Sequence, residues 1–294
     1  MKAKLTPGSA LWNVAKAIIY CVMVFFALSF VAIFVWVFFN SFKTAPEFMQ
    51  NTLGLPQIKW DYQNYLDIFD FEYKNNNLLQ MLGNTVIMIA INVFCNLTFP
   101  VMAGYVFGRM EFKGRAKFEA FLYILMTIPV IGGASAQLKF LSALNLYDSY
   151  LGIFILQSGA FGSGMLILTS LFRGLPSAYA EAAYMDGAGE FTVFFKIYYP
   201  QALPLLSINI ISGIIAVWND YMTAYIFLPT HPTIALGLQQ LQRTADVHGS
   251  DYPLMFAGII LTMIPVFIVF SFIAKNIFNS KDIGALKYGK GVLS

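Results

Sequence analysis

The chain has 294 residues, of which 58% are hydrophobic and 11% are charged, and its mean hydropathy is +0.66. A soluble domain carries about 25% charged residues, so the composition excludes an ordinary soluble protein and predicts an integral membrane protein. The net charge of +3 does not indicate nucleic-acid binding, because the basic residues are scattered near the ends of apolar runs. We therefore expect a single membrane domain over residues 1–294.

Several apolar stretches are long enough to cross a hydrocarbon core about 30 Å thick. They cover residues 17–39, 79–107, 118–140, 151–172, 203–228 and 253–275. The first stretch exceeds the roughly 7–15 residues of a signal-peptide core and lacks a small-residue cleavage site, so we expect it to be retained. The pattern predicts an all-α membrane protein with about six transmembrane helices.

The basic residues predict the orientation of these helices. Thirteen of the 18 Lys and Arg residues lie at the termini or in the connections after the second and fourth stretches. Because basic residues favour the cytoplasmic side, we expect both termini in the cytoplasm of a multi-pass cell-membrane protein, with residues 40–78 outside. An apolar helical face within that outer segment, which we expect to lie on the membrane, is formed by Tyr62, Tyr65, Leu66 and Phe69.

Two stretches carry polar or small residues at regular spacing. Asn84, Asn92 and Asn96 are separated by multiples of four residues, which predicts a polar stripe that faces protein or water. Gly159, Gly162 and Gly164 in the fourth stretch are expected to permit close helix packing, with a role in lining a passage as the alternative.

Residues 173–200 are too polar to span a membrane but are patterned like two short helices. Pro176 can begin a helix, an Ala-rich segment follows, and Gly187 suits a left-handed C-terminal cap. One apolar face with helical spacing comes next, and Pro200 is expected to end it. This face consists of Phe191, Phe194, Phe195, Tyr198 and Tyr199. The sequence therefore predicts a compact cytoplasmic knob of two short helices.

The same segment resembles the EAA loop of ABC importer permeases, which reads E-A-A-x3-G-x9-I-x-L-P. Tyr199 replaces the usual leucine, and the rest of the spacing matches. In that family the loop supplies coupling helices that dock in a cleft on an ATPase subunit, whereas E-A-A followed by Gly can also be only a capped helix. The resemblance implies that the ATPase-coupling residues are Glu181, Ala182, Ala183, Met185, Asp186, Gly187, Ile197 and Pro200.

Further matches, in order along the chain, resemble the smaller six-span permease of maltose-type systems in the carbohydrate branch. They are Asn84-Thr85, Ala103-Gly104-Tyr105 with Arg109, Phe112-Lys113-Gly114-Arg115, Ile128-Pro129, Asp186-Gly187-Ala188, Trp218-Asn219-Asp220 and Pro265. The chain departs from this pattern around Ala136-Gln137, where a second proline is usual, and after Phe278, where a glycine is expected. These departures leave the shape of the solute path open.

The resemblance implies a type I ABC importer permease fold and a non-catalytic membrane subunit of an ATP-hydrolysing transport complex. The expected partners are a second homologous permease subunit, two ATPase subunits, an extracytoplasmic solute-binding protein and membrane lipid, with no nucleic acid. ATP and Mg²⁺ are expected on the ATPase subunits, and no cofactor on this chain. In the family, the loop before the last span, here residues 229–252, can reach into the binding protein.

The implied function is import of a carbohydrate, in particular an oligosaccharide, by alternating access. A polyol or a glycerol phosphodiester is the alternative solute, and an ion-coupled secondary transporter with Asp220 as its acid, or a non-transporting scaffold, is the alternative class. Side-chain hydroxyl and amide groups can exchange hydrogen bonds with a sugar. The candidate solute path consists of Asn209, Ser212, Trp218, Asn219, Asp220 and Tyr221.

Two other patterns do not support a site. Residues 284–290 have Walker A spacing, but Gly291 follows where Ser or Thr would reach Mg²⁺, so the chain is not expected to bind ATP there. The outer loop before the last stretch contains His231, His248, Asp246 and Asp251. Their spacing matches no usual ligand pattern, so no metal is expected.

Overall fold

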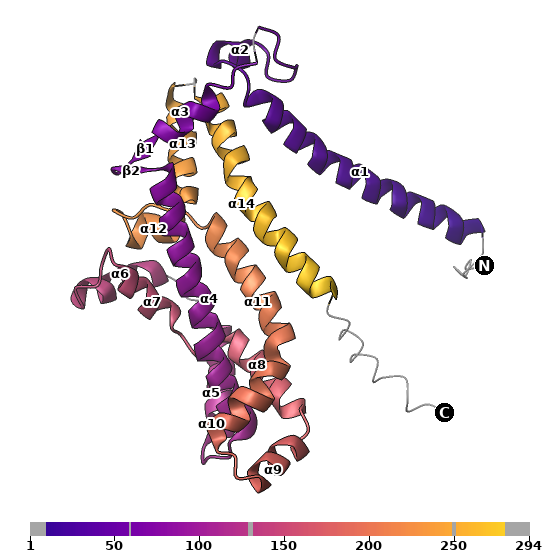
Figure 1. The fold of residues 1–294 in the computed structure, drawn as a ribbon, viewed down its shortest axis with the longest axis vertical. Coiled ribbons are helices and arrows are strands. Elements are labelled where there is room, and N and C mark those ends of the chain that lie inside the picture. The colour runs from indigo at the N-terminus through magenta and orange to yellow at the C-terminus, as the bar shows by residue number, and fades with distance from the viewer. Residues whose placement is uncertain (1–9, 59, 129–131, 249–250, 280–294) are drawn as a thin grey trace. The chain divides into compact units, whose positions relative to one another are not determined.

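The computed structural model describes residues 10–58, 60–128, 132–248 and 251–279, and these are mostly helical (Figure 1). The chain divides into two compact units, one of Met1–Phe71 with Gln240–Ser294 and one of Glu72–Gln239. In the described ranges, the helices long and apolar enough to cross a membrane are Trp12–Asn40, Leu78–Arg109 and Glu190–Asn219. Tyr252–Ile268 is a shorter apolar stretch, and it belongs to the helix Tyr252–Asn279. The count of six spans and the single membrane domain remain predictions.

The first unit packs around its C-terminal helix. Its elements are α1 (Ala10–Asn40), α2 (Ala45–Gln50), α3 (Asn64–Asp70), the C-terminal part of α13 (Ile234–His248) and α14 (Tyr252–Asn279). The ring of Phe256 on α14 lies 5.3 Å from that of Trp36 and 5.5 Å from that of Phe48, which joins α14 to α1 and α2. Residues 229–252, the predicted connection before the last span, contain the helix α13, and their contact with a binding protein remains a prediction.

The helix expected to lie on the membrane is present as α3, but it is shorter than the pattern suggested. Leu66 and Phe69 on α3 are exposed, whereas Tyr62 precedes the helix and Tyr65 is half-buried, with its hydroxyl 2.6 Å from Ser41 Oγ. Ile68 is fully buried, and α3 packs against α14. The exposed apolar side chains are those that membrane contact would use, and that contact remains a prediction.

The second unit is organised around α4 (Leu78–Arg109). A capping box fixes its start, because Asn77 accepts from the Gln80 N–H and the Gln80 side chain accepts from the Asn77 N–H. A two-residue hairpin of β1 (Glu72–Tyr73) and β2 (Asn76–Asn77) precedes it, turning through two residues with positive φ. The helix packs against α7 (Tyr150–Gln157), α8 (Ser163–Gly174) and α11 (Tyr199–Asn219) (Figure 1).

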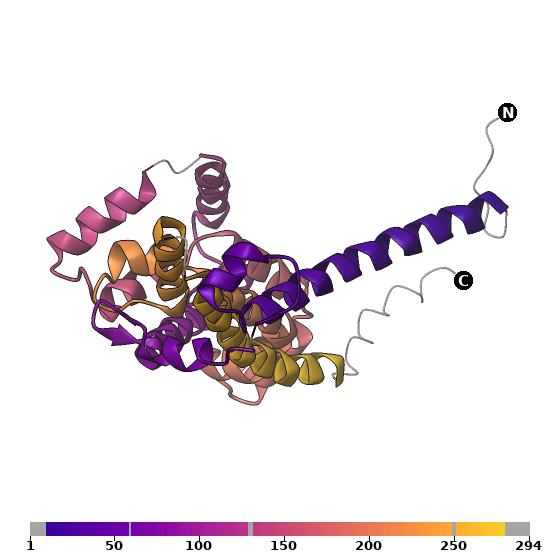
Figure 2. The same cartoon turned by 90° about the horizontal axis from the view of Figure 1, so that it is seen from above.

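Three stretches predicted as continuous spans each contain two helices, which is a correction. Residues 118–140 fall on α5 (Arg115–Thr127) and α6 (Gly133–Ala143), which run in different directions, and 129–131, including Pro129, lie outside the described residues (Figure 2). Residues 151–172 fall on α7 and α8, and residues 203–228 on α11 and α12 (Met222–Phe227). Average hydropathy does not detect these breaks, because a backbone turn can occur within an apolar stretch.

The three glycines of the fourth stretch lie at or beside one of these breaks. A Cβ atom built on Gly164, on α8, would lie 3.9 Å from Pro100 Cβ of α4, so this glycine lies at a helix contact as predicted. A Cβ atom on Gly159 or Gly162 would meet nothing within 4 Å, so within this chain these two do not serve close helix packing. Gly159 and Gly162 both belong to the non-helical segment between α7 and α8. Their place in the sequence is explained by the chain interruption, where glycine carries little steric cost.

Candidate functional site

The predicted knob is present and begins with α9 (Ala178–Met185). Gly187 has φ +81°, so its prediction as a left-handed cap is confirmed. Its N–H donates to the Tyr184 carbonyl at 3.0 Å, and the Ala188 N–H donates to the Ala183 carbonyl at 2.9 Å. These bonds close α9 and turn the chain into α10 (Glu190–Val193).

The second part of the knob does not end at Pro200, which corrects the prediction of two short helices. A π-helical turn, η1 (Phe194–Tyr198), follows α10 and leads directly into α11, so Glu190–Asn219 forms one 30-residue helix. The Tyr199 N–H donates to the Phe194 carbonyl, five residues back. This wider turn accommodates Pro200, which has no N–H for an ordinary helical bond. The knob is thus continuous with a helix of membrane-spanning length.

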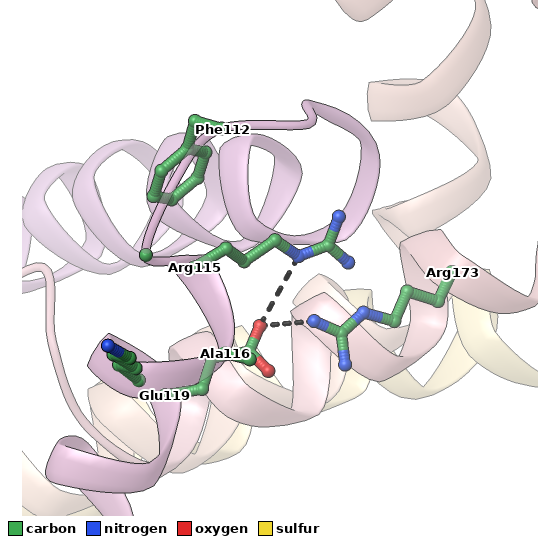
Figure 3. A pocket seen from close by; sticks show the side chains of 7 residues that line it. Phe112, Arg115, Ala116, Glu119 and Arg173 are labelled. Atoms are coloured by element: carbon green, nitrogen blue, oxygen red, sulfur yellow. Dashed lines mark hydrogen bonds and ion pairs between the residues drawn. The ribbon is translucent and has the colours of Figure 1, made fainter.

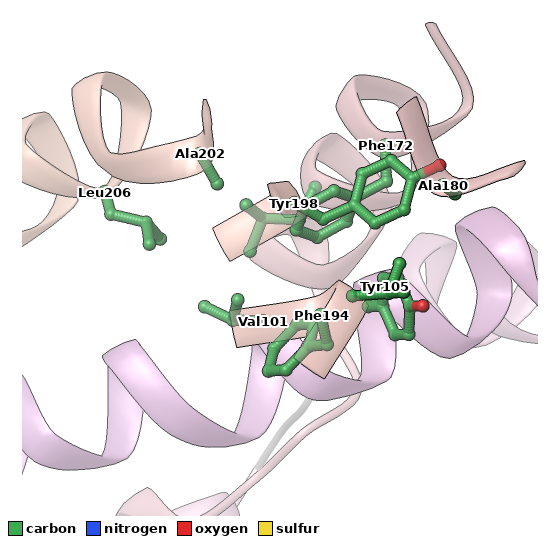
Figure 4. Close-up of a cluster of buried hydrophobic side chains, with 10 residues drawn as sticks. Val101, Tyr105, Phe172, Ala180, Phe194, Tyr198, Ala202 and Leu206 are labelled. Atoms are coloured by element: carbon green, nitrogen blue, oxygen red, sulfur yellow. The ribbon is translucent and has the colours of Figure 1, made fainter. Parts of the chain in front are cut away.

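A buried cluster joins the knob to α4 and α8 (Figure 4). Tyr105 on α4 is its centre, with ring centroids 4.8 Å from Phe194, 5.4 Å from Tyr198 and 5.9 Å from Phe172. From α9, Ala180 enters the same cluster. Since buried interiors are close-packed and resist deformation, the knob, α4 and α8 are coupled mechanically.

The apolar face predicted after Gly187 is divided in the structure. Phe194 and Tyr198 are buried, Tyr199 is half-buried, and Phe191 and Phe195 are exposed by 76% and 55%. The change from α-helix to π-helix after Val193 alters the residue spacing that shares a face, so a constant helical period could not predict this division.

Polar contacts fix the same junction. The Tyr105 hydroxyl donates to Glu190 Oε2 at 2.9 Å. The Arg109 guanidinium lies 4.5 Å from the centre of the Tyr198 ring and donates to the Leu175 carbonyl. Burial raises the pKa of Tyr184, and the neighbouring Glu190 carboxylate raises it further, so this hydroxyl stays protonated. A hollow of about 480 Å³ on the knob is lined by Tyr105, Arg109, Tyr184, Glu190 and Tyr198 among others.

Sequence reasoning did not assign Tyr105, Arg109 or Glu190 to the coupling site. The available signal was the pair Gly104 and Gly108, four residues apart on one face of α4. A Cβ atom on Gly104 would lie 2.7 Å from Leu168 Cβ, and one on Gly108 would lie 2.8 Å from Phe172 Cβ. This close approach of α4 and α8 places Tyr105 and Arg109 beneath the knob.

The tip of the knob is exposed. Most of the predicted coupling residues lie on its surface, namely Glu181, Ala182, Met185, Asp186, Gly187 and Pro200. Ala183 and Ile197 are half-buried and pack against the cluster beneath. The Met185 side chain is 87% exposed, which is unusual for a large apolar residue on a polar segment and typical of a contact surface. The geometry suits docking to another protein, and the role of these residues remains a prediction.

The structure brings some of the candidate solute-path residues together on one helix face. Asn209, Ser212 and Asn219 are all exposed and share one face of α11, while Trp218 and Tyr221 are half-buried. Asp220 lies at the helix break, where its Oδ1 accepts the Thr223 N–H at 3.0 Å and caps α12. This bond gives Asp220 a structural role, and contact of these residues with solute remains a prediction.

The asparagine stripe on α4 has mixed environments. Asn84 donates to the Pro232 carbonyl at 2.9 Å and accepts from the Tyr150 hydroxyl at 2.8 Å, so it faces protein. Asn92 lies against Gly213 of α11, and Asn96 is exposed. The stripe therefore holds α4 to its neighbours at one end.

In the part of the chain that the structure describes, the side chains of the histidine loop form no group of three metal-ligating residues. The Nδ1 atom of His231 lies 3.5 Å from Asp148 Oδ1, and its ring packs on Tyr150. The side chain of His248 and residues 284–290 lie outside the described part.

Comparisons with known proteins agree with this arrangement. Residues 100–281 match the family described as "Binding-protein-dependent transport system inner membrane component". The probable ABC transporter permease protein YurM of Bacillus subtilis (strain 168) is 25% identical over 94% of this chain and 90% of its own length. The diacetylchitobiose uptake system permease protein NgcG of Streptomyces coelicolor is 26% identical over 92% of this chain and 89% of its own.

A solved structure has the same fold. A chain of a bacterial ABC transporter involved in the import of the acidic polysaccharide alginate superposes with a TM-score of 0.74 and 22% identity, covering 92% of this chain and 99% of the other. The matching family region contains the end of α4 and all elements from α5 to α14, including the knob. The chain therefore belongs to the binding-protein-dependent transport system inner membrane components, and it is a multi-pass membrane subunit of an ABC importer rather than an enzyme.

Proposed function

We propose that this chain is the permease subunit of an ABC importer for an oligosaccharide, which it moves by alternating access coupled to a separate ATPase. The exposed knob carries this proposal, because it is anchored by the Tyr105 cluster and continues into α11. The carbohydrate class is supported by relatives named for diacetylchitobiose and for alginate import. A polyol or glycerol phosphodiester has no comparable support among these relatives.

The partners follow from this role. Two ATPase subunits, which bind ATP and Mg²⁺, dock at the knob, and a second homologous permease subunit completes the solute path. A solute-binding protein delivers the sugar on the extracytoplasmic side. The excess of basic residues near the knob supports a cytoplasmic location for it and for both termini.

The geometry suggests how movement reaches the solute path. Closure of the ATPase subunits displaces the tip at Met185, and the buried cluster transfers that displacement to α4 and α8. Because η1 runs without interruption into α11, the exposed face at Asn209 and Asn219 turns with the knob. ATP binding then shifts the population between two arrangements of the helices, since it favours the arrangement in which the ATPase subunits are closed.

The function is tested by assembling the chain in liposomes with its partner permease, ATPase and binding protein. We expect ATP hydrolysis to be stimulated by binding protein loaded with an oligosaccharide, and labelled sugar to accumulate only with ATP. Parallel assays with a polyol and a glycerol phosphodiester determine the solute class. A complex without ATPase subunits that takes up solute in an imposed ion gradient would instead identify a secondary transporter.

The exposed face of α11 gives a prediction for solute affinity. We expect Asn219→Ala to raise the sugar concentration for half-maximal uptake by about tenfold, as for loss of one hydrogen-bonding group, with basal ATP hydrolysis unchanged. Asp220→Asn should alter uptake less, because an amide oxygen can still cap Thr223. Measured at equal membrane abundance, an unchanged half-maximal concentration for Asn219→Ala would place the sugar contacts elsewhere.

A further inference from the structure

A second hollow, of about 550 Å³, lies where α5 begins beside the end of α8 (Figure 3). It shares no lining residue with the hollow on the knob. Its charged lining consists of Arg115, Lys117, Glu119 and Arg173. Three cations face one carboxylate here, so the pocket has an excess of positive charge that neither ATPase coupling nor the solute path explains.

The two guanidinium groups are held in place, although they share one carboxylate. Glu119 Oε1 accepts from Arg173 Nη2 and lies 3.7 Å from Arg115 Nε (Figure 3). Arg173 also donates to the Phe107 carbonyl at 3.1 Å, and Arg115 donates to the Met110 carbonyl at 3.2 Å. Each guanidinium has five N–H donors, so these fixed groups can still bind an anion. Little ordering would be required on binding.

The surroundings indicate the source of that anion. Phe112, at the rim of the pocket, is 42% exposed. Phe121, four residues after the lining residue Lys117 on α5, is 53% exposed. A cationic pocket therefore adjoins an apolar helical surface, as at the boundary between lipid headgroups and acyl chains. The proposed orientation places this boundary at the cytoplasmic leaflet, where anionic lipids attract basic segments.

We propose that this pocket binds the phosphate of an anionic phospholipid headgroup, whose acyl chains lie along the exposed apolar surface of α5. The phosphate oxygens accept hydrogen bonds from Arg115 and Arg173, and Lys117 adds its charge at the rim. A free phosphate has the same headgroup chemistry, but it would not use the apolar surface beside the pocket. The site would make the α4–α5 connection sensitive to the composition of the membrane.

Lipid binding to the purified full-length chain in nonionic detergent tests this proposal independently of transport. Dioleoylphosphatidylglycerol and dioleoylphosphatidylcholine are titrated separately, and bound lipid is counted by native mass spectrometry. We expect selective binding of phosphatidylglycerol, with affinity about tenfold lower in the variant Arg115→Gln/Lys117→Gln. Lys196→Gln is the matched control for the single variant Lys117→Gln, because each removes one exposed positive charge and Lys196 does not line the pocket.

Several other outcomes of this experiment would contradict the proposal. Equal binding of the two lipids, or equal loss in the Lys196→Gln control, would indicate nonspecific attraction. Displacement of phosphatidylglycerol by millimolar inorganic phosphate, without selectivity for the intact lipid, would identify a free-anion site instead. If the double variant does not fold, Lys117→Gln alone decides, since Lys117 is exposed. Its affinity for phosphatidylglycerol must fall, and an unchanged value overturns the proposal.

Discussion

Replacing Met185 by lysine should abolish coupling of the assembled transporter to its ATPase while leaving the permease folded. Apolar side chains at the centre of protein interfaces contribute about 2 kcal/mol or more, which corresponds to roughly 30-fold weaker docking. An ammonium group placed in such a contact would also have to lose its water. In the chain alone, 87% of the Met185 side chain is exposed, so its replacement removes little internal packing.

The substitution is chosen so that the helix itself is retained. A lysine at position 185 lies four residues after Glu181, at the C-terminal end of α9, where both the ion pair and the helix dipole are favourable. The matched control is Met185→Leu, which keeps an apolar side chain of similar volume. We expect sugar-stimulated ATP hydrolysis and uptake to be lost in the lysine variant and retained in the leucine variant. Normal hydrolysis in both variants would show that the tip is not the docking anchor.

The sequence predicted those parts of the fold that depend on length, mean hydropathy and local backbone chemistry. The second predicted span, 79–107, corresponds closely to α4, because an unbroken apolar run leaves a helix as the only way to pair its backbone groups in lipid. Gly187 was likewise predictable, since a glycine after an Ala-rich helix favours a left-handed cap.

The missed features depend on exceptions to the regular helix and on contacts between distant residues. The continuation past Pro200 relies on a π-helical turn, whereas an ordinary helical period predicts an end at that proline. The division of α11 from α12 depends on Asp220 capping a new helix within an apolar stretch. The anchors of the knob were missed because Tyr105 and Glu190 are 85 residues apart, and only the folded chain brings them into contact.

Because α4 and α8 are closely packed, we expect a substitution at Gly104 to cause the largest loss of stability. A Cβ atom there would lie 2.7 Å from Leu168 Cβ and 3.3 Å from the Met165 carbonyl oxygen. Because backbone atoms cannot rotate away, Gly104→Leu must force the two helices apart, and overpacking of this kind costs about 1–3 kcal/mol or more. Tyr105 follows Gly104 on α4, so the buried cluster around it would lose its packing when the two helices separate.

Gly83 provides the control on the same helix. A Cβ atom at Gly83 would meet nothing within 4 Å, so Gly83→Leu should leave the stability of the isolated chain unchanged or slightly higher, through the better helix propensity of leucine. We expect the thermal unfolding midpoint in detergent to fall clearly for Gly104→Leu and to stay within error for Gly83→Leu. Equal midpoints for the two variants would mean that α4 and α8 can separate at little cost. In that case the buried cluster could not transmit movement from the knob as a rigid unit, and coupling would have to pass through α11 alone.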